Sequence, residues 1–139
     1  MKVYVESGFA SLAVDRVVKA LHDYLPFDIV DNEEESDLNI LHVVGRLNAV
    51  TRRAKEKPYA VIQYALRSTM QKDTEAWREL WQGAKVVWSY YDLPAMIKAD
   101  GHDFSIPFYH SPLGVDPEFK QTKSRRDFII ATTGASRLS

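Results

Sequence analysis

Short apolar runs alternate with amphipathic helical patterns along this chain, and this alternation restricts the fold more than any other feature. Residues 38–44, Leu-Asn-Ile-Leu-His-Val-Val, show little of the alternation expected of a strand with one face in water. Such a run is typical of a central parallel strand that helices cover on both faces. The order of strands and helices, with room for crossovers between them, predicts an α/β fold with a doubly wound parallel sheet.

The remaining predicted elements follow the same alternation. Apolar residues between Ala10 and Leu25 recur on one face of a helix, which Pro26 ends. Asp73 is a suitable N-cap for a helix that stops near Gly83. The predicted strands are Lys2–Val5, Phe27–Val30, Leu38–Val44, Tyr59–Tyr64, Lys85–Ser89 and Ile106–Tyr109, and the predicted helices cover residues 10–25, 47–57, 73–83 and 92–101.

Composition narrows the class of protein. The length of 139 residues, with 45% hydrophobic and 27% charged residues, fits one domain with a substantial core. A formal net charge of -1 argues against a nucleic-acid partner, because such domains are usually strongly basic. The lack of cysteine excludes a disulfide framework, a thiol nucleophile and cysteine-ligated zinc. The histidines show no metal-ligand spacing, so we expect no metal site.

Five segments match, in order, the pattern of a known enzyme family. Asn39–Gly45 and Lys57–Tyr64 are similar to its strand ends "Asp-Val-Ile-His-x-His-Gly" and "Pro-x-Val-x-Thr-x-His". Val86–Ser89 resembles its strand that ends in Ser before a short helix. Ser111–Phe119 resembles its "Pro-Asn-Gly-Val-Asp-x-x-x-Phe" crossover, and Phe128–Leu138 its next strand and "Gly-Arg-Leu-Ser" loop. Together these segments resemble the family-4-like GT-B glycosyltransferases over essentially the whole chain.

The resemblance implies a division into parts and a reaction. Residues 1–119 would form the Rossmann-like acceptor-side domain, 120–127 the interdomain linker, and 128–139 the start of the absent C-terminal donor domain. The whole enzyme would transfer a sugar from a nucleotide-sugar donor to an unknown hydroxyl acceptor in the interdomain cleft. The chain itself, without the donor domain, is expected to be inactive and to hold no cofactor.

Candidate site residues follow from the position of the strands. In open α/β sheets, ligands bind outside the carboxyl ends of the strands. His42 matches the family's strand-end histidine and is the candidate catalytic residue, with a buried core histidine as the alternative. Tyr64 and Tyr90 could stack on a sugar ring or simply cover the core. The predicted acceptor-binding residues are Ser7, Gly8, Phe9, Gly45, Arg46, Tyr64, Ser89 and Tyr90.

The charged stretches give only weak indications of a binding partner. The acidic residues 31–37 are most simply a solvated turn, and the basic residues of the helix over 47–57 a solvated face. With Arg46, these basic residues could instead approach an anionic lipid headgroup, as peripheral members of the resembled family do. The unpaired apolar run within 128–139 could lead to self-association. The basic residues of the helix predicted over 47–57 are Arg52, Arg53, Lys55 and Lys57.

The expected partners are therefore a small-molecule, glycan or lipid acceptor and the missing donor domain, in a cytoplasmic protein that contacts a membrane at most peripherally. The main alternative is a stand-alone flavodoxin-like or receiver-like α/β binding module without enzymatic activity. A receiver needs an acidic pair after the first strand, where this chain has the single Glu6. A third alternative is a non-enzymatic remnant or interaction module.

Overall fold

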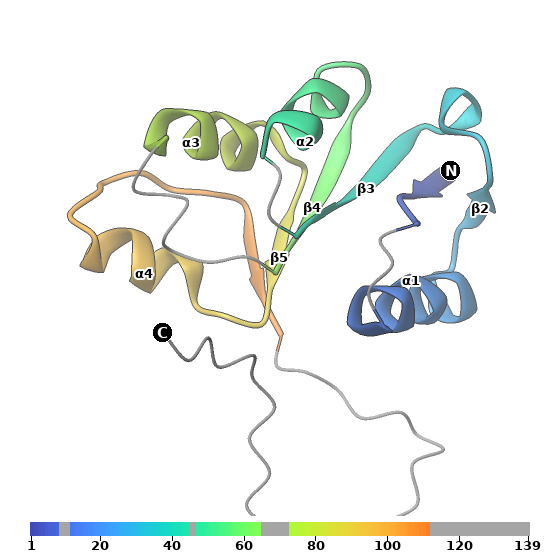
Figure 1. Ribbon diagram of the computed structural model, residues 1–139, viewed down its shortest axis with the longest axis horizontal. Coiled ribbons are helices and arrows are strands. Elements are labelled where there is room, and N and C mark those ends of the chain that lie inside the picture. The colour runs from blue at the N-terminus through green and yellow to red at the C-terminus, as the bar shows by residue number, and fades with distance from the viewer. Residues whose placement is uncertain (9–11, 45–46, 65–72, 112–139) are drawn as a thin grey trace, which may run out of the picture.

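A six-stranded, all-parallel sheet forms the centre of the protein, in the strand order β2-β1-β3-β4-β5-β6 (Figure 1). The computed structural model describes residues 1–8, 12–44, 47–64 and 73–111. The predicted α/β parallel sheet is confirmed. The strands are β1 (Lys2–Val5), β2 (Asp28–Val30), β3 (Leu38–Val43), β4 (Tyr59–Gln63), β5 (Val87–Ser89) and β6 (Phe108–His110); the helices are α1 (Leu12–Tyr24), the 3-10 turn η1 (Glu33–Glu35), α2 (Leu47–Ala54), α3 (Thr74–Gly83) and α4 (Leu93–Ala99).

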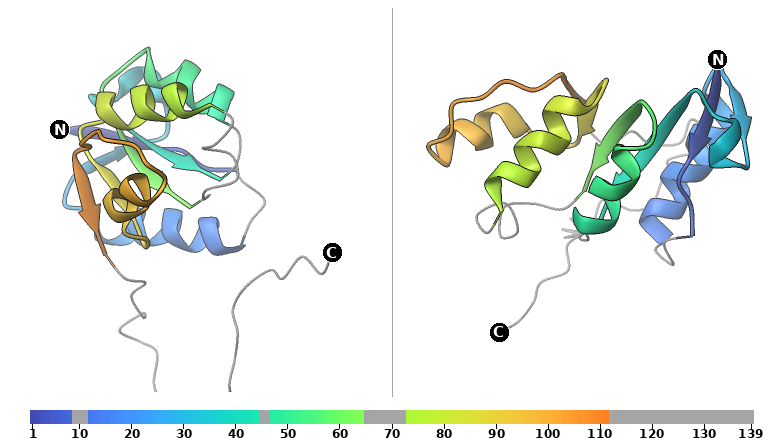
Figure 2. Two further views of the ribbon diagram at one scale, coloured as in Figure 1. Left: turned by 90° about the vertical axis from the view of Figure 1, so that its left-hand side faces the viewer. Right: turned by 90° about the horizontal axis from the view of Figure 1, so that it is seen from above.

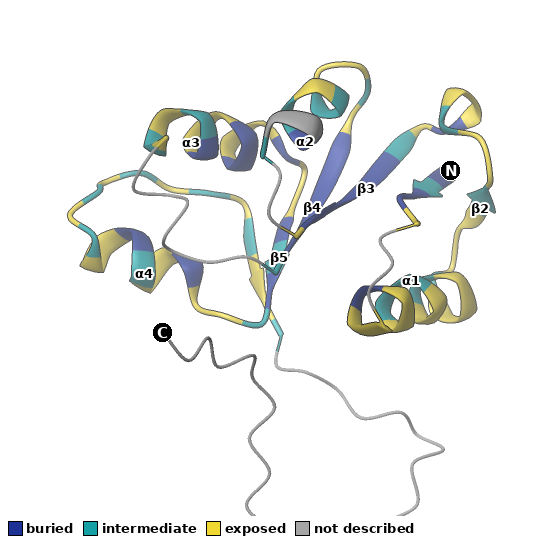
Figure 3. Ribbon diagram, in the orientation of Figure 1, coloured by how far each residue is buried: buried dark blue, intermediate teal, exposed yellow. Residues whose placement is uncertain are grey.

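The prediction of a central third strand is confirmed. β3 pairs with β1 on one side and with β4 on the other, where the register runs from Asn39 opposite Tyr59 to Val43 opposite Gln63. Every residue of β4 is buried, and Leu41 of β3 is fully buried. Both strands are therefore covered on both faces, as Figure 3 shows, which explains why their sequences lack alternation.

Helices cover the two faces unequally (Figure 2). α1 connects β1 to β2, whereas α2, α3 and α4 follow β3, β4 and β5. Because crossovers are right-handed and the strand order reverses between β1 and β3, α1 lies on one face and the other three helices lie on the opposite face. We call these the α1 side and the α3 side of the sheet.

Each side has its own apolar cluster. Burial of each Val, Leu or Ile side chain stabilises the fold by about 1.5–3 kcal/mol. On the α1 side, α1 packs over strand residues Val3, Val5, Ile40, Ala60 and Ile62. On the α3 side, the larger cluster joins residues of α2, α3 and α4 to the strands; its buried helical members are Val50, Trp77, Leu80, Trp81, Leu93 and Ile97.

Several predicted boundaries differ from the structure by two or three residues. β5 begins at Val87 rather than Lys85, and α4 ends at Ala99 rather than at residue 101. Two further differences lie close to a proline. β6 begins at Phe108 rather than Ile106, because Pro107 has no N–H to donate and its carbonyl accepts from the Val87 N–H at 2.7 Å. α2 ends at Ala54, whereas the pattern predicted a helix to residue 57. Pro58 disfavours helical geometry at Lys57, and the residues between α2 and Lys57 form turn hydrogen bonds, from the Lys55 N–H to the Arg52 carbonyl and from the Glu56 N–H to the Arg53 carbonyl. The predicted linker and donor-domain start, 120–127 and 128–139, lie outside the described residues, as does the end of the predicted 1–119 domain.

Candidate functional site

The ends of the strands bring distant residues together at one edge of the sheet, which we call the carboxyl edge. Glu6 follows β1, Tyr64 follows β4 and Tyr90 follows β5. The strand order reverses between β1 and β3, and such a reversal marks the usual ligand crevice of an open α/β sheet. The carboxyl edge has two halves with different chemistry.

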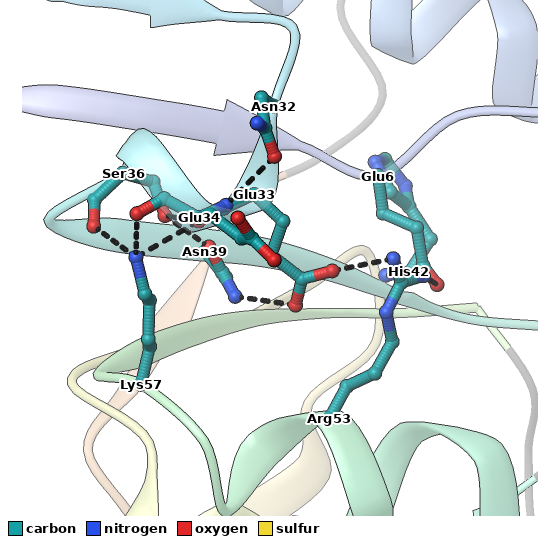
Figure 4. A network of polar contacts seen from close by, with 9 residues as sticks. All are labelled: Glu6, Asn32, Glu33, Glu34, Ser36, Asn39, His42, Arg53 and Lys57. Carbon is teal, nitrogen blue, oxygen red and sulfur yellow. Dashed lines mark hydrogen bonds and ion pairs between the residues drawn. The ribbon is translucent and has the colours of Figure 1, made fainter.

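An ionic network begins with Glu6 at the reversal point and extends toward the amino ends of β3 and β4, where η1 and Lys57 lie (Figure 4). Glu6 receives a hydrogen bond from the Arg53 guanidinium at 2.5 Å and one from the backbone N–H of His42 at 3.0 Å. The other Arg53 nitrogen donates to Glu33 of η1 at 2.7 Å. Each of the two carboxylates therefore binds the same arginine. The Glu6 side chain is 11% exposed and that of Arg53 34%, so the network is largely withdrawn from water.

The protonation of Arg53 follows from these contacts. Burial by itself lowers the pKa of the guanidinium, but the hydrogen bonds and negative charges of Glu33 and Glu6 outweigh it and raise the pKa overall. The guanidinium also lies over the ring of Tyr4, 5.8 Å from its centroid. Arg53 is therefore a permanent cation whose donors face two carboxylates, and its role is to neutralise them.

Lys57 completes the network from the other end. Its ammonium donates to the backbone carbonyl oxygens of Glu33, Glu34 and Ser36 at 2.9, 2.6 and 2.8 Å. A cation at the end of a helical turn is favourable because the unpaired carbonyls carry partial negative charge. Arg53 and Lys57 thus turn inward, which corrects the expectation of a wholly solvated basic face. The acidic stretch 31–37 is likewise not simply a solvated turn.

A row of aromatic rings occupies the other half, on the α1 side. The rings of His42 and Tyr64 stack with centroids 5.7 Å apart, and the rings of Tyr64 and Tyr90 meet edge to face at 6.0 Å. Tyr90 in turn meets Trp88 edge to face at 5.2 Å. We call His42, Tyr64, Tyr90 and Trp88 the aromatic row. Three separate strands contribute to it, so the fold and not local sequence brings these rings together.

Strand register explains why the row forms. Ile62 of β4 lies opposite His42 of β3 and Trp88 of β5. Ile62 belongs to the α1-side cluster, and residues two apart in a strand point to the same face, so Tyr64 and Tyr90 project to that side too. The Tyr64 N–H donates to the Val43 carbonyl at 3.1 Å, which fixes the backbone of Tyr64 just beyond β4.

Burial keeps the row uncharged. His42 is 1% exposed, and burial lowers its pKa from 6.5 to about 4, so the imidazole is neutral at pH 7. Burial also raises the pKa of Tyr64, to which the neighbouring Tyr90 adds, and burial raises the pKa of Tyr90. Nδ1 of His42 lies 3.0 Å from the Tyr64 hydroxyl oxygen. His42 therefore holds Tyr64 in place from beneath.

The predicted acceptor-binding residues fall into four groups. Tyr64 and Tyr90 are brought together and remain half-buried, whereas Ser7 and Gly8 are exposed beyond β1. Gly8 has a φ of 84°, a left-handed conformation that favours glycine, with open space around it. Ser89 is 1% exposed. The remaining predicted residues, Phe9, Gly45 and Arg46, lie outside the described residues.

Two of the predicted residues have contacts that suggest a supporting role. The Ser89 hydroxyl donates to the Gln63 carbonyl at 3.1 Å and accepts from the Tyr91 N–H at 3.2 Å, so it joins the ends of β4 and β5. His42 has almost no accessible surface, and its imidazole faces the Tyr64 hydroxyl. Both side chains shape the site from within.

Sequence reasoning missed three residues of the two networks: Glu6, Arg53 and Trp88. Glu6 comes directly after a predicted strand, which is the same kind of position that makes Ser7 a candidate. From the sequence, Glu6 was considered only as an acidic residue of a receiver-like domain. Trp88 alternates with Tyr90, which already indicates a shared face. No sequence signal distinguishes Arg53, which turns inward, from its neighbours on the same helix.

Comparisons with known proteins leave this site to be interpreted from its own geometry. The chain matches no family model, no curated protein and no solved structure. Within the described ranges, no group of His, Asp or Glu side chains is arranged to hold a metal ion. None of the helices in those ranges has the length and apolar character needed to cross a bilayer.

Proposed function

We propose that this chain is the acceptor-side domain of a glycosyltransferase, and that it holds the acceptor at the aromatic half of the carboxyl edge. The observation that carries this proposal is the row His42–Tyr64–Tyr90–Trp88, in which the buried ring of His42 supports half-buried rings from β4, β5 and their ends. The ordered resemblance to GT-B glycosyltransferases supports it from the sequence.

The division of labour follows from the chemistry present. A nucleotide-sugar donor carries a diphosphate, which needs cations or a cradle of backbone N–H groups. In the described residues, Arg53 already binds Glu6 and Glu33, and Lys57 binds three carbonyl oxygens. The donor would therefore be held by the second domain, and the acceptor by this one. Transfer would take place where the two domains close, because closure aligns the reactants and excludes water.

The test is a comparison of binding with transfer. Calorimetric titration of residues 1–139 with UDP- and GDP-sugars should give no heat, while the longest reading frame that contains this chain should bind a donor and transfer its sugar. In that longer protein, Tyr64→Ala and Tyr90→Ala should lower transfer at least about tenfold and leave donor binding unchanged. Tight nucleotide-sugar binding by residues 1–139 alone would contradict the division, and wild-type transfer in both variants would remove this site.

The strand order favours a second candidate. The first five strands lie in the order β2-β1-β3-β4-β5, which is the strand order of flavodoxin-like domains. Such domains bind a mononucleotide at the reversal between β1 and β3. A stand-alone binding domain without transfer is therefore the alternative function. Its ligand would have to share the reversal point with the Glu6–Arg53 ion pair. Titration with FMN and with inorganic phosphate separates the two candidates, because only the flavodoxin-like alternative expects either to bind.

A further inference from the structure

The aromatic row does not stop at the carboxyl edge but continues onto the open part of the α1 side. Trp88 lies opposite Tyr109 of β6 in register, and both side chains point to the α1 side. Of the helices in the described ranges, α1 is the one on this side, and it packs toward the β1 and β2 end of the sheet (Figures 1 and 2). Tyr109 is left 62% exposed.

Exposure therefore rises stepwise along this series of aromatic residues, which passes from the ends of β4 and β5 back along β5 and across to β6. His42 is 1% exposed, Tyr64, Tyr90 and Trp88 are half-buried, and Tyr109 is largely in water. The inner end of the line rests on the core, and the outer end is accessible. A surface of this kind can bind a ligand along its length without reorganising the fold, because its inner rings are already fixed by their neighbours.

The charge of the surface restricts the ligand. The imidazole of His42 and the hydroxyls of Tyr64 and Tyr90 are neutral at pH 7, and indole carries no charge. The cations of the ionic network, Arg53 and Lys57, contact carboxylates and carbonyl oxygens. An anionic headgroup or a phosphate would find no arginine or lysine in the aromatic row, whereas a neutral ligand loses nothing by binding there.

The rings select the shape of the neutral ligand. A pyranose has a face of C–H groups, which packs against an aromatic ring, and a rim of hydroxyls, which can bond to the hydroxyls of Tyr64, Tyr90 and Tyr109. Successive rings of the row lie 6.0 and 5.2 Å apart, a spacing similar to the length of one sugar unit. A single small molecule would cover only part of this line, whereas an oligosaccharide would follow it.

We infer that Tyr64, Tyr90, Trp88 and Tyr109 form a binding surface for a neutral oligosaccharide, with His42 as a positioning residue beneath Tyr64. The chemical class of the ligand follows from the geometry of the surface. Its identification as the acceptor rests on the proposed function. The sugar enters over Tyr109 and Trp88, and its reacting end lies at Tyr64 and Tyr90 on the carboxyl edge.

The three tryptophans provide an internal control for the test. Trp77 and Trp81 lie in the α3-side cluster and are 2% and 3% exposed, whereas Trp88 lies on the proposed surface. The 139-residue protein is titrated with cellotriose, maltotriose and tri-N-acetylchitotriose while the three indole N–H signals are followed by NMR. At least one trisaccharide should shift the Trp88 signal saturably and leave the Trp77 and Trp81 signals in place. If none shifts the Trp88 signal, the inference is wrong.

Two tyrosine variants test the outer end of the surface without disturbing the core. Tyr109→Ala should weaken binding of the active trisaccharide about threefold to tenfold, the range expected for losing one aromatic contact. Tyr24→Ala removes a tyrosine that is 68% exposed at the end of α1, and it should leave the affinity unchanged. Equal weakening in both variants would contradict the inference.

Two further probes separate the ligand class from the proposed function. Inorganic phosphate and vesicles of phosphatidylcholine with phosphatidylglycerol should leave the Trp88 signal unshifted, and a shift with either of them but with no sugar would overturn the inference. A trisaccharide could bind as expected while none of the longer proteins that contain this chain transfers sugar. In that case the proposed function fails and the surface stands. If transfer occurs and Tyr109→Ala changes neither the affinity for acceptor nor the rate, the surface fails and the function stands.

Discussion

The two halves of the carboxyl edge solve the same problem in opposite ways. In both halves, the residues at the ends of parallel strands are partly buried and need partners for their polar groups. Over β1 the protein uses charge, and Arg53 lies between Glu6 and Glu33. Over β4 and β5 it uses neutral rings, and each ring contacts the next. The contacts of the ionic half are internal, whereas the aromatic half keeps ring surface and hydroxyls at the boundary with solvent. From this difference we infer that the reversal point is structural here, and we propose that binding is displaced toward β4, β5 and β6.

The largest effect should be a pH dependence that originates in the aromatic half. Burial lowers the pKa of His42 from 6.5 to about 4, so the unfolded chain binds more protons than the folded protein between these values. His42 therefore contributes stability that is complete above pH 6.5 and is lost as the pH falls toward 4. Over that window the free energy of unfolding should drop by roughly 3 kcal/mol on account of this residue.

Urea denaturation at a series of pH values measures this pH dependence of the unfolding free energy. The decline between pH 6.5 and 4 should be clearly shallower in His42→Gln than in the wild type. His22→Gln, which replaces an exposed histidine of α1, should keep the wild-type slope. Identical slopes in all three proteins would show that His42 is not held neutral by its surroundings.

The next effect tests the ionic half. Arg53→Met removes the cation shared by Glu6 and Glu33, and the largely buried Glu6 carboxylate is left without a counter-charge. Breaking one partner of a fully buried pair costs about 3–5 kcal/mol, and because Arg53 is one-third exposed we expect a loss of about 2–3 kcal/mol in unfolding free energy.

The matched control is Lys19→Met, which removes a cation from the exposed pair with Asp23 on α1. Exposed pairs contribute little, so this variant should lose less than about 1 kcal/mol. If both variants lose equally little in urea denaturation, the Glu6–Arg53–Glu33 network does not stabilise the reversal point.

The smallest effect concerns the link between His42 and Tyr64. Tyr64→Phe keeps the ring but removes the hydroxyl that faces Nδ1 of His42, which should cost about 1 kcal/mol in unfolding free energy. Tyr109→Phe removes the hydroxyl of a residue that is 62% exposed and should change the stability by no more than a few tenths of a kcal/mol. Equal stability of Tyr64→Phe and wild type would show that His42 does not position this ring through its hydroxyl.

Much of the fold was predictable because it depends on local pattern. The apolar runs that became β3 and β4 lack alternation, and prolines and glycines mark most of the boundaries. The start of β6 was misplaced because Ile106 is apolar and packs against the core from a loop, while Pro107 has no N–H to donate to the sheet ladder. A hydrophobic pattern reports burial, and burial extends beyond the hydrogen-bonded strand.

The site was less predictable because it depends on which strands become neighbours. Tyr64 and Tyr90 were identified from their positions after strands, and this reasoning needs no strand order. The stacking of His42 beneath Tyr64 needs the β3–β4 register, and the inward turn of Arg53 needs the position of η1 near the start of β3. Neither contact can be predicted from the local sequence, in which His42 resembles a ligand-binding residue at a strand end and Arg53 resembles a charged surface residue.

The most direct test of this account is a chemical-shift map of the carboxyl edge of the 139-residue protein, titrated with cellotriose, maltotriose and tri-N-acetylchitotriose in turn and then with inorganic phosphate. The account predicts that the bound trisaccharide shifts the backbone amides of Tyr64 and Tyr90, whereas the Glu6 amide and the Arg53 Nε–H signal stay in place with both kinds of ligand. Shifts at Glu6 and Arg53 on addition of phosphate, with Tyr64 and Tyr90 unmoved by every sugar, would contradict it and return the binding site to the reversal point.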